Sequence, residues 1–165
     1  MKLEIIKHND ILFRDLLRAI AVKSIAWPHP LESQVRWIVD NMHEDDEHVF
    51  LRDVDKDIAY MTLSPVVGVM NGLPVSFMGV GCVCSANPGM GGGKLLIINI
   101  NKYLTDNNQR GLLFCKENLV GFYSKYNWKV IPPERVCFKE PHEGVFTMSY
   151  NVDDIQKLDY TDRFF

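Results

Sequence analysis

A cluster of glycines at residues 89–93 constrains the fold of this chain more than any other feature. The glycines of the cluster are Gly89, Gly91, Gly92 and Gly93. The residues before it, Phe77–Cys84, are apolar and typical of a strand, and the apolar residues after Lys94 recur at helical spacing. The cluster therefore predicts a tight loop where a strand leads into a helix. Such a loop lets a ligand approach the main chain closely, although a glycine-rich turn that binds nothing is the alternative.

A loop of this kind suits a phosphate or pyrophosphate. The unpaired N–H groups of the first helical turn point outward, with the positive end of the helix dipole behind them. Two common patterns do not fit. The Walker pattern needs Gly where Pro88 stands and Ser or Thr where Leu95 stands. The dinucleotide pattern G-x-G-x-x-G, started at Gly89, ends on Lys94. Both kinds of nucleotide site are therefore excluded.

The remaining pattern predicts one domain over residues 1–165 with an α+β fold. The predicted strands lie at 3–6, 48–54, 58–69, 73–84, 111–115, 128–131, 135–138 and 145–150. The predicted helices lie between Asp10 and Trp27, at 31–42, after the glycine cluster, and at 116–126. Asn71-Gly72 indicates a hairpin, because both residues tolerate positive φ. An antiparallel run of strands before one phosphate loop favours a mixed, mostly antiparallel central sheet with helices on both faces. A turn is expected at 141–144, and 151–165 has no assignment.

The first two helices are predicted to be amphipathic. Asp10 is expected to cap the first. Its apolar face is predicted to hold Leu12, Leu16, Leu17, Ile20 and Ala21. Its charged residues Arg14, Asp15, Arg18 and Lys23 are expected to lie outside. In the second helix, the residues expected to point inward are Leu31, Val35, Ile38 and Val39.

Composition narrows the class of protein. With 165 residues, 47% hydrophobic, 24% charged and a net charge of -3, the chain is typical of a single soluble domain. Scattered Lys and Arg give no reason to expect nucleic acid. The start is too short and too charged for a signal peptide, and no apolar stretch approaches the ~20 residues that span a bilayer. We therefore expect a cytoplasmic protein with no membrane partner. The four cysteines lack zinc-site spacing, so no metal is expected and all four are interpreted as buried, reduced thiols.

Two motifs carry a resemblance to a known family. Gly91-Gly92-Gly93 fits the second half of [QR]-x-x-G-x-[GA], the short signature of an acetyl-CoA site between a strand and a helix. About thirty residues later, Phe122-Tyr123-x-Lys125-x-x-Trp128 fits F-Y-x-K-x-G-[FW], with Asn127 in place of the glycine. The chain resembles the GNAT superfamily of N-acetyltransferases in these motifs and in the order of its predicted elements.

The resemblance implies an acetyl-CoA site and a catalytic acid. It assigns the main chain of Val83, Cys84 and Ser85 to the pantetheine arm, in a gap beside the strand at 111–115. It assigns the pyrophosphate to the main-chain amides of Gly89, Met90, Gly91, Gly92, Gly93 and Lys94. It also assigns Asn118 as a further cofactor contact. Tyr123 matches the tyrosine that protonates the departing CoA thiolate. A phenol suits that role, because free phenol and thiol pKa values are about 10 and about 8.5. The alternative is that Tyr123 is an aromatic core residue beside Phe122.

The acceptor side is less defined. Trp27 and His29 lie where relatives build part of the acceptor wall, although a hydrophobic cap over the core is the alternative. Spacing leaves the general base open. Its candidates are His29, Asp45, Asp46, His48 and Glu117, and His48 is interpreted as a structural hydrogen-bonding residue. The acidic run Glu44–Glu47 is interpreted as a solvated turn.

The predicted function is transfer of an acetyl group from acetyl-CoA to a primary amine of a small molecule or peptide, by direct attack. The chain is expected to act as a monomer or homodimer. Pro88 replaces the usual Gln or Arg of the signature and lacks a donor N–H, and Met90 stands where basic residues are frequent. These departures predict weaker CoA binding. They also motivate an alternative, a CoA-binding or sensor module without turnover. A third hypothesis is an interaction domain that binds no CoA.

Overall fold

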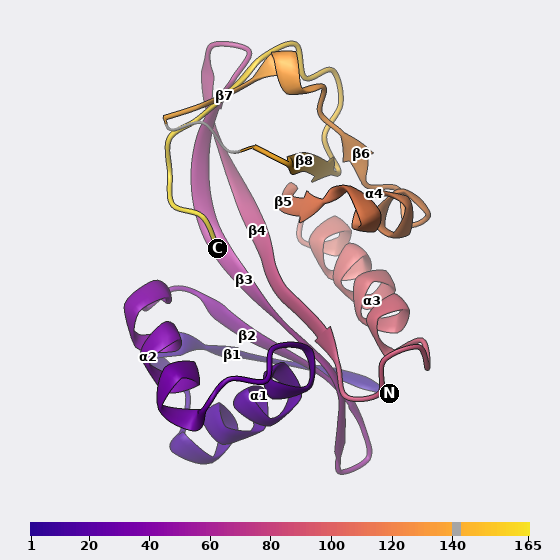
Figure 1. Ribbon diagram of the computed structural model, residues 1–165. Coiled ribbons are helices and arrows are strands. Elements are labelled where there is room, and N and C mark those ends of the chain that lie inside the picture. The colour runs from indigo at the N-terminus through magenta and orange to yellow at the C-terminus, as the bar shows by residue number, and fades with distance from the viewer. Residues whose placement is uncertain (140–142) are drawn as a thin grey trace. The chain divides into compact units, whose positions relative to one another are not determined.

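The computed structural model describes residues 1–139 and 143–165. These residues form four α-helices and nine strands. The chain divides into two compact units, one of residues 1–64, 81–99 and 165 and the other of 65–80 and 100–164. Figure 1 labels the long strands β3 (Lys56–Met70) and β4 (Leu73–Ser85) and helix α3 (Gly92–Asp106). Each of these three elements contributes residues to both units.

The first unit contains an antiparallel sheet and two helices. Its strand order is β1-β2-β3-β4, with β1 at Lys2–Lys7 and β2 at Glu47–Asp53. Both β1–β2 and β2–β3 are antiparallel. Helices α1 (Phe13–Ala26) and α2 (Leu31–Asn41) complete the unit. A buried cluster joins α1 to the sheet, and its members are Ala19, Val22, Phe50, Tyr60 and Cys84.

Helix α1 buries only part of the predicted face. Ile20 is buried and Leu16 packs against its cluster, as expected. Leu12 and Leu17 are 54% and 38% exposed, whereas the charged Asp15 and Lys23 are buried. Asp15 is buried because Arg18 Nη1 donates to its carboxylate at 2.8 Å. The charged face is stabilised by a network in which Arg18 also donates to Asp57 and Glu4. Asp15 and Arg18, on the predicted polar side of α1, therefore face the protein, because Glu4 and Asp57 help to neutralise the charge of Arg18. Arg14 is exposed, as predicted. Ala21, predicted inside, is exposed as well.

Three further predictions for these helices are wrong. Asp10 does not cap α1, which begins at Phe13 with Leu12 as N-cap and no side-chain cap hydrogen bond. In α2, Leu31 and Val39 are 56% and 70% exposed. Ile38 is buried as predicted, in a cluster with Ile20 and Met42, and Val35 packs against this cluster.

In the second unit the strand order is β3-β4-β5-β8-β6. The added strands are β5 (Gly111–Lys116), β6 (Lys129–Val130) and β8 (Val145–Tyr150). β5 pairs parallel with β4 and antiparallel with β8. The parallel pairing consists of Met78 with Gly111 and Gly79 with Leu112, so it stops well before the end of β4. Helix α4 (Glu117–Ser124) follows β5 directly.

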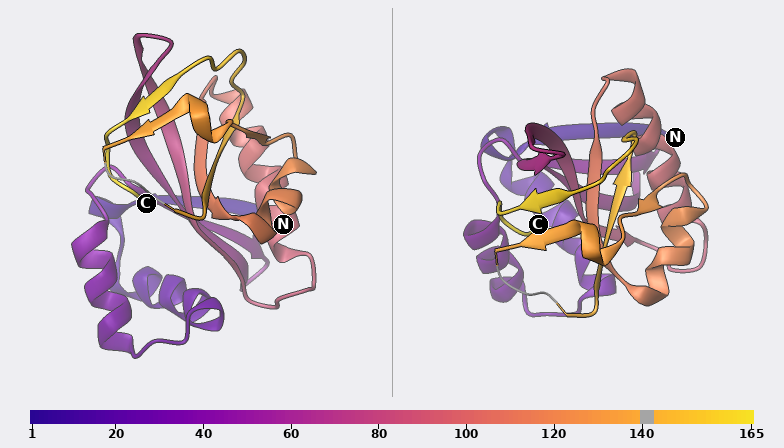
Figure 2. Two further views of the ribbon diagram at one scale, coloured as in Figure 1. Left: turned by 45° about the horizontal axis from the view of Figure 1, so that its top comes forward. Right: turned by 90° about the horizontal axis from the view of Figure 1, so that it is seen from above.

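Two short strands in the same unit extend outward from β3, first β9 (Leu158–Tyr160) and then β7 (Val136–Phe138). β9 pairs antiparallel with β3 and parallel with β7, as the two neighbouring arrows of Figure 2 show. β9 lies in the tail that received no assignment from the sequence. The predicted turn at 141–144 begins outside the described residues.

The fold class is confirmed as a mixed, mostly antiparallel α+β arrangement. Every predicted strand is present with ends within two residues of the expected ones. The hairpin prediction is also confirmed, because Asn71 and Gly72 have φ of +52° and +84° between β3 and β4. All four cysteines are free. Cys84 and Cys115 are buried as expected, whereas Cys82 is half-buried and Cys137 is exposed. None of the helices in the described part of the chain is long and apolar enough to cross a membrane.

Candidate functional site

The glycine loop (residues 86–91) joins β4 to α3 within the first unit. Gly89 and Gly91 both have φ of +82°, a conformation that side chains rarely adopt. The Met90 amide donates to the carbonyl oxygen of Asn87 at 3.2 Å. The Met90 amide, one of those assigned by resemblance to a pyrophosphate, is therefore already paired inside the loop.

The first turn of α3 presents free main-chain donors. Its first hydrogen bond runs from the Leu95 amide to the Gly91 carbonyl oxygen at 3.0 Å. Among residues 1–139 and 143–165, none accepts a hydrogen bond from the amides of Gly92, Gly93 or Lys94. These three N–H groups stand at the positive end of the helix dipole. The turn can therefore bind an anion such as a phosphate.

Gly92 holds this helix end close to β3 and β4. A Cβ atom on it would lie 2.5 Å from Ser85 Oγ and 3.1 Å from the Ile58 carbonyl oxygen. Ser85 Oγ in turn donates to the Asn87 carbonyl oxygen at 3.2 Å. The close approach at Gly92 is thus coupled to the hydrogen bond that fixes the start of the loop.

The end of β4 carries an irregularity at Cys82. Its φ is +51°, in the left-handed region, inside the strand. The preceding Gly81 is packed against Phe165 and Thr62, and a Cβ atom there would lie 2.8 Å from the Phe165 carbonyl carbon. Burial raises the pKa of the Cys82 thiol, and burial beside Cys82 raises the pKa of Cys84 to about 12. Both thiols are therefore protonated at neutral pH and are poor nucleophiles.

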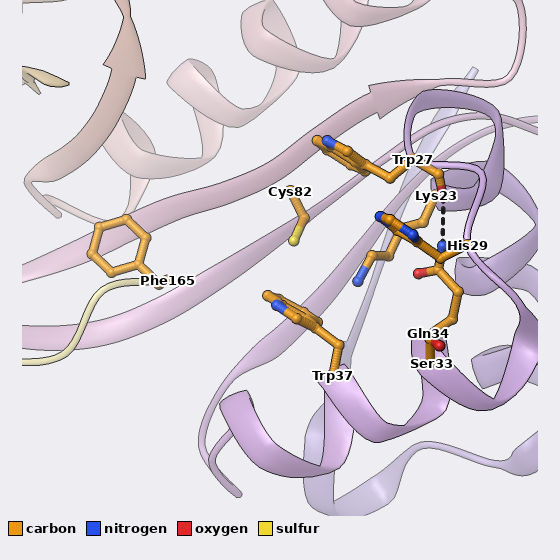
Figure 3. Close-up of a pocket in the computed structure, with 8 residues that line it drawn as sticks. All are labelled: Lys23, Trp27, His29, Ser33, Gln34, Trp37, Cys82 and Phe165. Carbon is orange, nitrogen blue, oxygen red and sulfur yellow. Dashed lines mark hydrogen bonds between the residues drawn. The ribbon is translucent and has the colours of Figure 1, made fainter. Parts of the chain in front are cut away.

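A pocket of about 520 Å³ lies in the first unit, and Trp27 and His29 line it (Figure 3). Its other lining residues are Lys23, Ser33, Gln34, Trp37, Cys82 and Phe165. The segment between α1 and α2 is tied to α2, because Gln34 Nε2 donates to the Trp27 carbonyl oxygen at 2.6 Å. The two residues that the resemblance places at an acceptor wall thus share a cavity with Cys82, the residue before Val83–Ser85.

Lys23 is the charged residue among the pocket residues that sequence reasoning missed. Its side chain is 4% exposed, and Nζ lies 3.6 Å from the centroid of the Trp37 ring. Burial lowers its pKa. Helical spacing from Leu16 and Ile20, at i+7 and i+3, was the available signal, because both residues were predicted to lie inside. A lysine is placed outside by default, so that signal carried no weight.

His48 lies in the core beside this pocket region. Its Nδ1 is 2.7 Å from the Tyr60 hydroxyl oxygen and its Nε2 is 2.9 Å from His8 Nδ1. Burial, followed by the charges of His8 and Lys23, lowers the pKa of His48 to about 4. His48 is therefore neutral at pH 7, and its hydrogen bonds agree with the structural role that was predicted for it.

The other base candidates of the first unit are divided by burial. Asp46 is 1% exposed and accepts a hydrogen bond from the His43 amide at 2.9 Å, so it is not part of a solvated turn. Asp45 is exposed and pairs with Lys7 at 3.9 Å. The remaining candidate of this unit is His29. It lines the pocket, whereas Asp45, Asp46 and His48 do not.

Tyr123, Asn118 and Glu117 belong to α4, in the second unit. Tyr123 is 6% exposed, with its ring 5.1 Å from that of Phe122 and 6.3 Å from that of Trp128. Burial raises the pKa of the Tyr123 hydroxyl. In the described part of the chain, no residue forms a hydrogen bond with this hydroxyl. The hydroxyl oxygen is also not fully enclosed by protein atoms. The phenol is therefore neutral and unpaired.

The last residue of the second motif has a structural role. Trp128 is 2% exposed, and its Nε1 donates to Asn101 Oδ1 at 2.9 Å. Asn101 Nδ2 donates to the Tyr126 carbonyl oxygen at 2.7 Å. The motif thus joins α3 to the end of α4 through buried hydrogen bonds.

Solved structures share this arrangement of elements. An acyl-CoA N-acyltransferase from Pseudomonas aeruginosa has a TM-score of 0.64 and 14% identity, over 91% of this chain and 99% of that chain. A GNAT family N-acetyltransferase from Escherichia coli, determined in complex with CoA, has a TM-score of 0.63 and 13% identity, over 97% and 90% of the two chains. ElaA from Escherichia coli has a TM-score of 0.59 and 15% identity, over 90% and 98%.

These likenesses establish the fold. At such low identities they show that the chain has the architecture of GNAT N-acetyltransferases. No protein-family model and no curated protein matches the sequence. The chemistry of the site must therefore be argued from its own residues.

Proposed function

We propose that residues 1–165 act as one acetyltransferase domain that transfers the acetyl group of acetyl-CoA to a primary amine of a small molecule or peptide. The neutral amine nitrogen attacks the thioester carbonyl carbon, the carbon–sulfur bond breaks, and the amine loses a proton. The CoA thiolate leaves and takes a proton from Tyr123, and the proton that the amine gives up returns to the Tyr123 phenolate through solvent. The two substrates are held together by the protein, which removes the entropic cost of their encounter.

One observation carries this proposal. The amides of Gly92, Gly93 and Lys94 are unpaired at the N-terminus of α3, directly after a loop with left-handed Gly89 and Gly91. This is the geometry that binds a pyrophosphate. The solved relative from Escherichia coli with a similar fold is a complex with CoA, which supports CoA as the ligand.

The end of β4 supports a bound pantetheine arm. Pairing with β5 ends at Gly79, so main-chain groups of Val83, Cys84 and Ser85 are suited to bind the amides of the arm. The raised pKa values of the nearby thiols argue against an acyl-cysteine intermediate, because a protonated thiol is a weak nucleophile. Direct attack by the amine follows as the preferred route.

Tyr123 is proposed as the acid and Asn118 as a cofactor contact. The raised pKa keeps the Tyr123 phenol protonated throughout the usual assay range. Its hydroxyl has no described hydrogen-bond partner, so its proton is available to a developing thiolate. Trp27 and His29 are proposed to form part of the acceptor wall.

A second candidate function is a CoA-binding or sensor module without turnover. Pro88 has no amide hydrogen, and Met90 is 81% exposed with no charge to offer a phosphate. Lys94 is the neighbouring cation that compensates in part. The loop thus has fewer phosphate donors than the signature implies, which favours weaker binding or loss of turnover.

A thiol-release assay with acetyl-CoA and a panel of primary amines separates the two functions. The proposed transferase releases CoA with at least one amine, and the release depends on amine concentration. Calorimetric binding of CoA with no release from any amine would favour the sensor. If millimolar acetyl-CoA gave no thermal shift, both CoA-dependent functions would fail.

A further inference from the structure

The pocket in the first unit contains a buried cation without an anionic partner. The exposed fraction of Lys23 is 4%, so the residue is more than nine-tenths buried. Across the described residues, no ion pair or hydrogen bond joins its Nζ to another group, and the Trp37 ring at 3.6 Å is its close contact. Figure 3 shows the ammonium directed into the cavity between Trp37 and Cys82. An ammonium held in this way is stabilised when a bound anion pairs with it.

The walls of the pocket define what accompanies that anion. Trp27, Trp37 and Phe165 supply flat apolar surfaces, while His29, Ser33 and Gln34 supply polar groups. A volume of about 520 Å³ accommodates a small molecule of amino-acid size. A cationic ligand is disfavoured, because Lys23 already covers the Trp37 ring and repels a second positive charge.

Building on the transferase activity proposed above, we infer that the acceptor is an aromatic or other apolar α-amino acid, whose carboxylate pairs with Lys23 and whose side chain lies between Trp27 and Trp37. Cys82 lines the same pocket and immediately precedes Val83–Ser85, the proposed pantetheine residues. A carboxylate at Lys23 therefore places the adjacent amine near the thioester end of the cofactor. The negative charge of the acceptor's carboxylate also offsets the positive charge of Lys23, which would otherwise repel the amine end of the acceptor.

Binding of product analogues tests the anion site without any turnover. The probes are N-acetyl-L-phenylalanine and N-acetylphenethylamine, which differ by the carboxylate and absorb little where tryptophan is excited. Fluorescence of Trp27 and Trp37 and calorimetry report binding to wild type, Lys23→Met, Lys23→Arg and the exposed control Lys125→Met.

The carboxylate probe should bind at least tenfold more tightly than the probe without a carboxylate, both to wild type and to Lys125→Met. Lys23→Met should abolish that preference, and Lys23→Arg should keep part of it. Equal binding of the two probes, binding of neither, or a preference that survives Lys23→Met would overturn the inference.

Turnover separates this inference from the proposed function. CoA release is measured with acetyl-CoA and either L-phenylalanine or phenethylamine. We expect kcat/KM at least tenfold higher for L-phenylalanine. Faster release with phenethylamine would leave acetyl transfer standing and refute the carboxylate site. Carboxylate-dependent binding without release from either amine would support the site and contradict the transferase.

Discussion

His48 Nδ1 and the hydroxyl oxygen of Tyr60 lie 2.7 Å apart in the core of the first unit. Tyr60 is fully buried, and burial raises the pKa of its phenol well above the usual value. The phenol therefore stays protonated and can donate to Nδ1 of a neutral imidazole. Protonation of His48 would remove that acceptor and place a charge in an apolar core. The folded state is therefore stable only while His48 is neutral.

This condition predicts a stability that falls in acid. The pKa of His48 is about 4 when folded and about 6.5 when unfolded, so the unfolded chain binds more protons between these values. Stability should be fully present above pH 6.5 and should decrease as the pH falls toward 4, by about 3 kcal/mol from this residue. His8 and Lys23 oppose the charged form and Asp46 favours it.

Unfolding free energies of wild type and His48→Gln, compared from pH 7.5 to 4, measure this contribution, because the carboxylates common to both proteins cancel. The imidazole can also be titrated directly by NMR in the wild-type protein. A His48 that titrates near 6.5 in the folded protein would refute the assignment.

Lys23→Met is expected to stabilise the protein at pH 7. Methionine has a similar length and no charge to desolvate, so the free energy of unfolding should rise by about 1 kcal/mol. Burial lowers the pKa of Lys23, which means that the folded protein disfavours the charged ammonium. Removal of that charge is therefore expected to raise the free energy of unfolding. Chemical denaturation of this variant beside the exposed control Lys125→Met, expected within about 0.5 kcal/mol of wild type, provides the measurement. Clear destabilisation by Lys23→Met would show that the ring contact with Trp37 outweighs desolvation.

Gly92→Ala should weaken CoA binding at least tenfold. The new methyl group would force Ser85 Oγ from its position and open the loop that aligns the amides of α3. Gly121→Ala is the matched control, because a Cβ on Gly121 meets nothing within 4 Å and alanine favours the helix by about 1 kcal/mol. Calorimetry with CoA compares the two, after circular dichroism has shown both to be folded. Unchanged affinity in a folded Gly92→Ala would remove the loop from the binding site.

Tyr123→Phe should lower kcat by about 10²-fold and leave the affinity for CoA unchanged. The ring contacts with Phe122 and Trp128 are retained in this variant, and the lost hydroxyl has no described hydrogen-bond partner. Stability should therefore change by less than about 1 kcal/mol. Tyr126→Phe, three residues further along the chain, serves as the control and should keep full activity. An unchanged kcat with an acceptor for which chemistry limits the rate would assign Tyr123 to the core alone.

Local signals in the sequence predicted the features that depend on neighbouring residues. The Asn71-Gly72 turn and the left-handed Gly89 and Gly91 follow from residue types that tolerate positive φ. The strands followed from their apolar composition. For the same reason, the strand, loop and helix around the glycine cluster could be placed without knowledge of the rest of the fold.

Features that depend on distant partners could not be predicted. Arg18 is held by Asp57, 39 positions away, and this permits the burial of a charged helix face. Lys23 meets Trp37 from a different helix, so its place in the pocket required the tertiary structure. Phe165 packs against Gly81 although the tail showed no pattern of its own. The alternation of apolar and polar residues along a helix assigns charged side chains to solvent. Arg18 and Lys23 depart from that rule because their partners come from other parts of the chain.

Transfer of a labelled acetyl group tests the central claim most directly. The protein is incubated with acetyl-CoA labelled with ¹³C at the acetyl carbonyl and with a mixture of primary amines that includes L-phenylalanine, and the carbonyl resonance is followed by NMR. We predict that the label moves from the thioester to an amide, at a rate that depends on the amine and is reduced in Tyr123→Phe. Label that stays in the thioester, or that is released as acetate at a rate independent of the amine, would contradict the account.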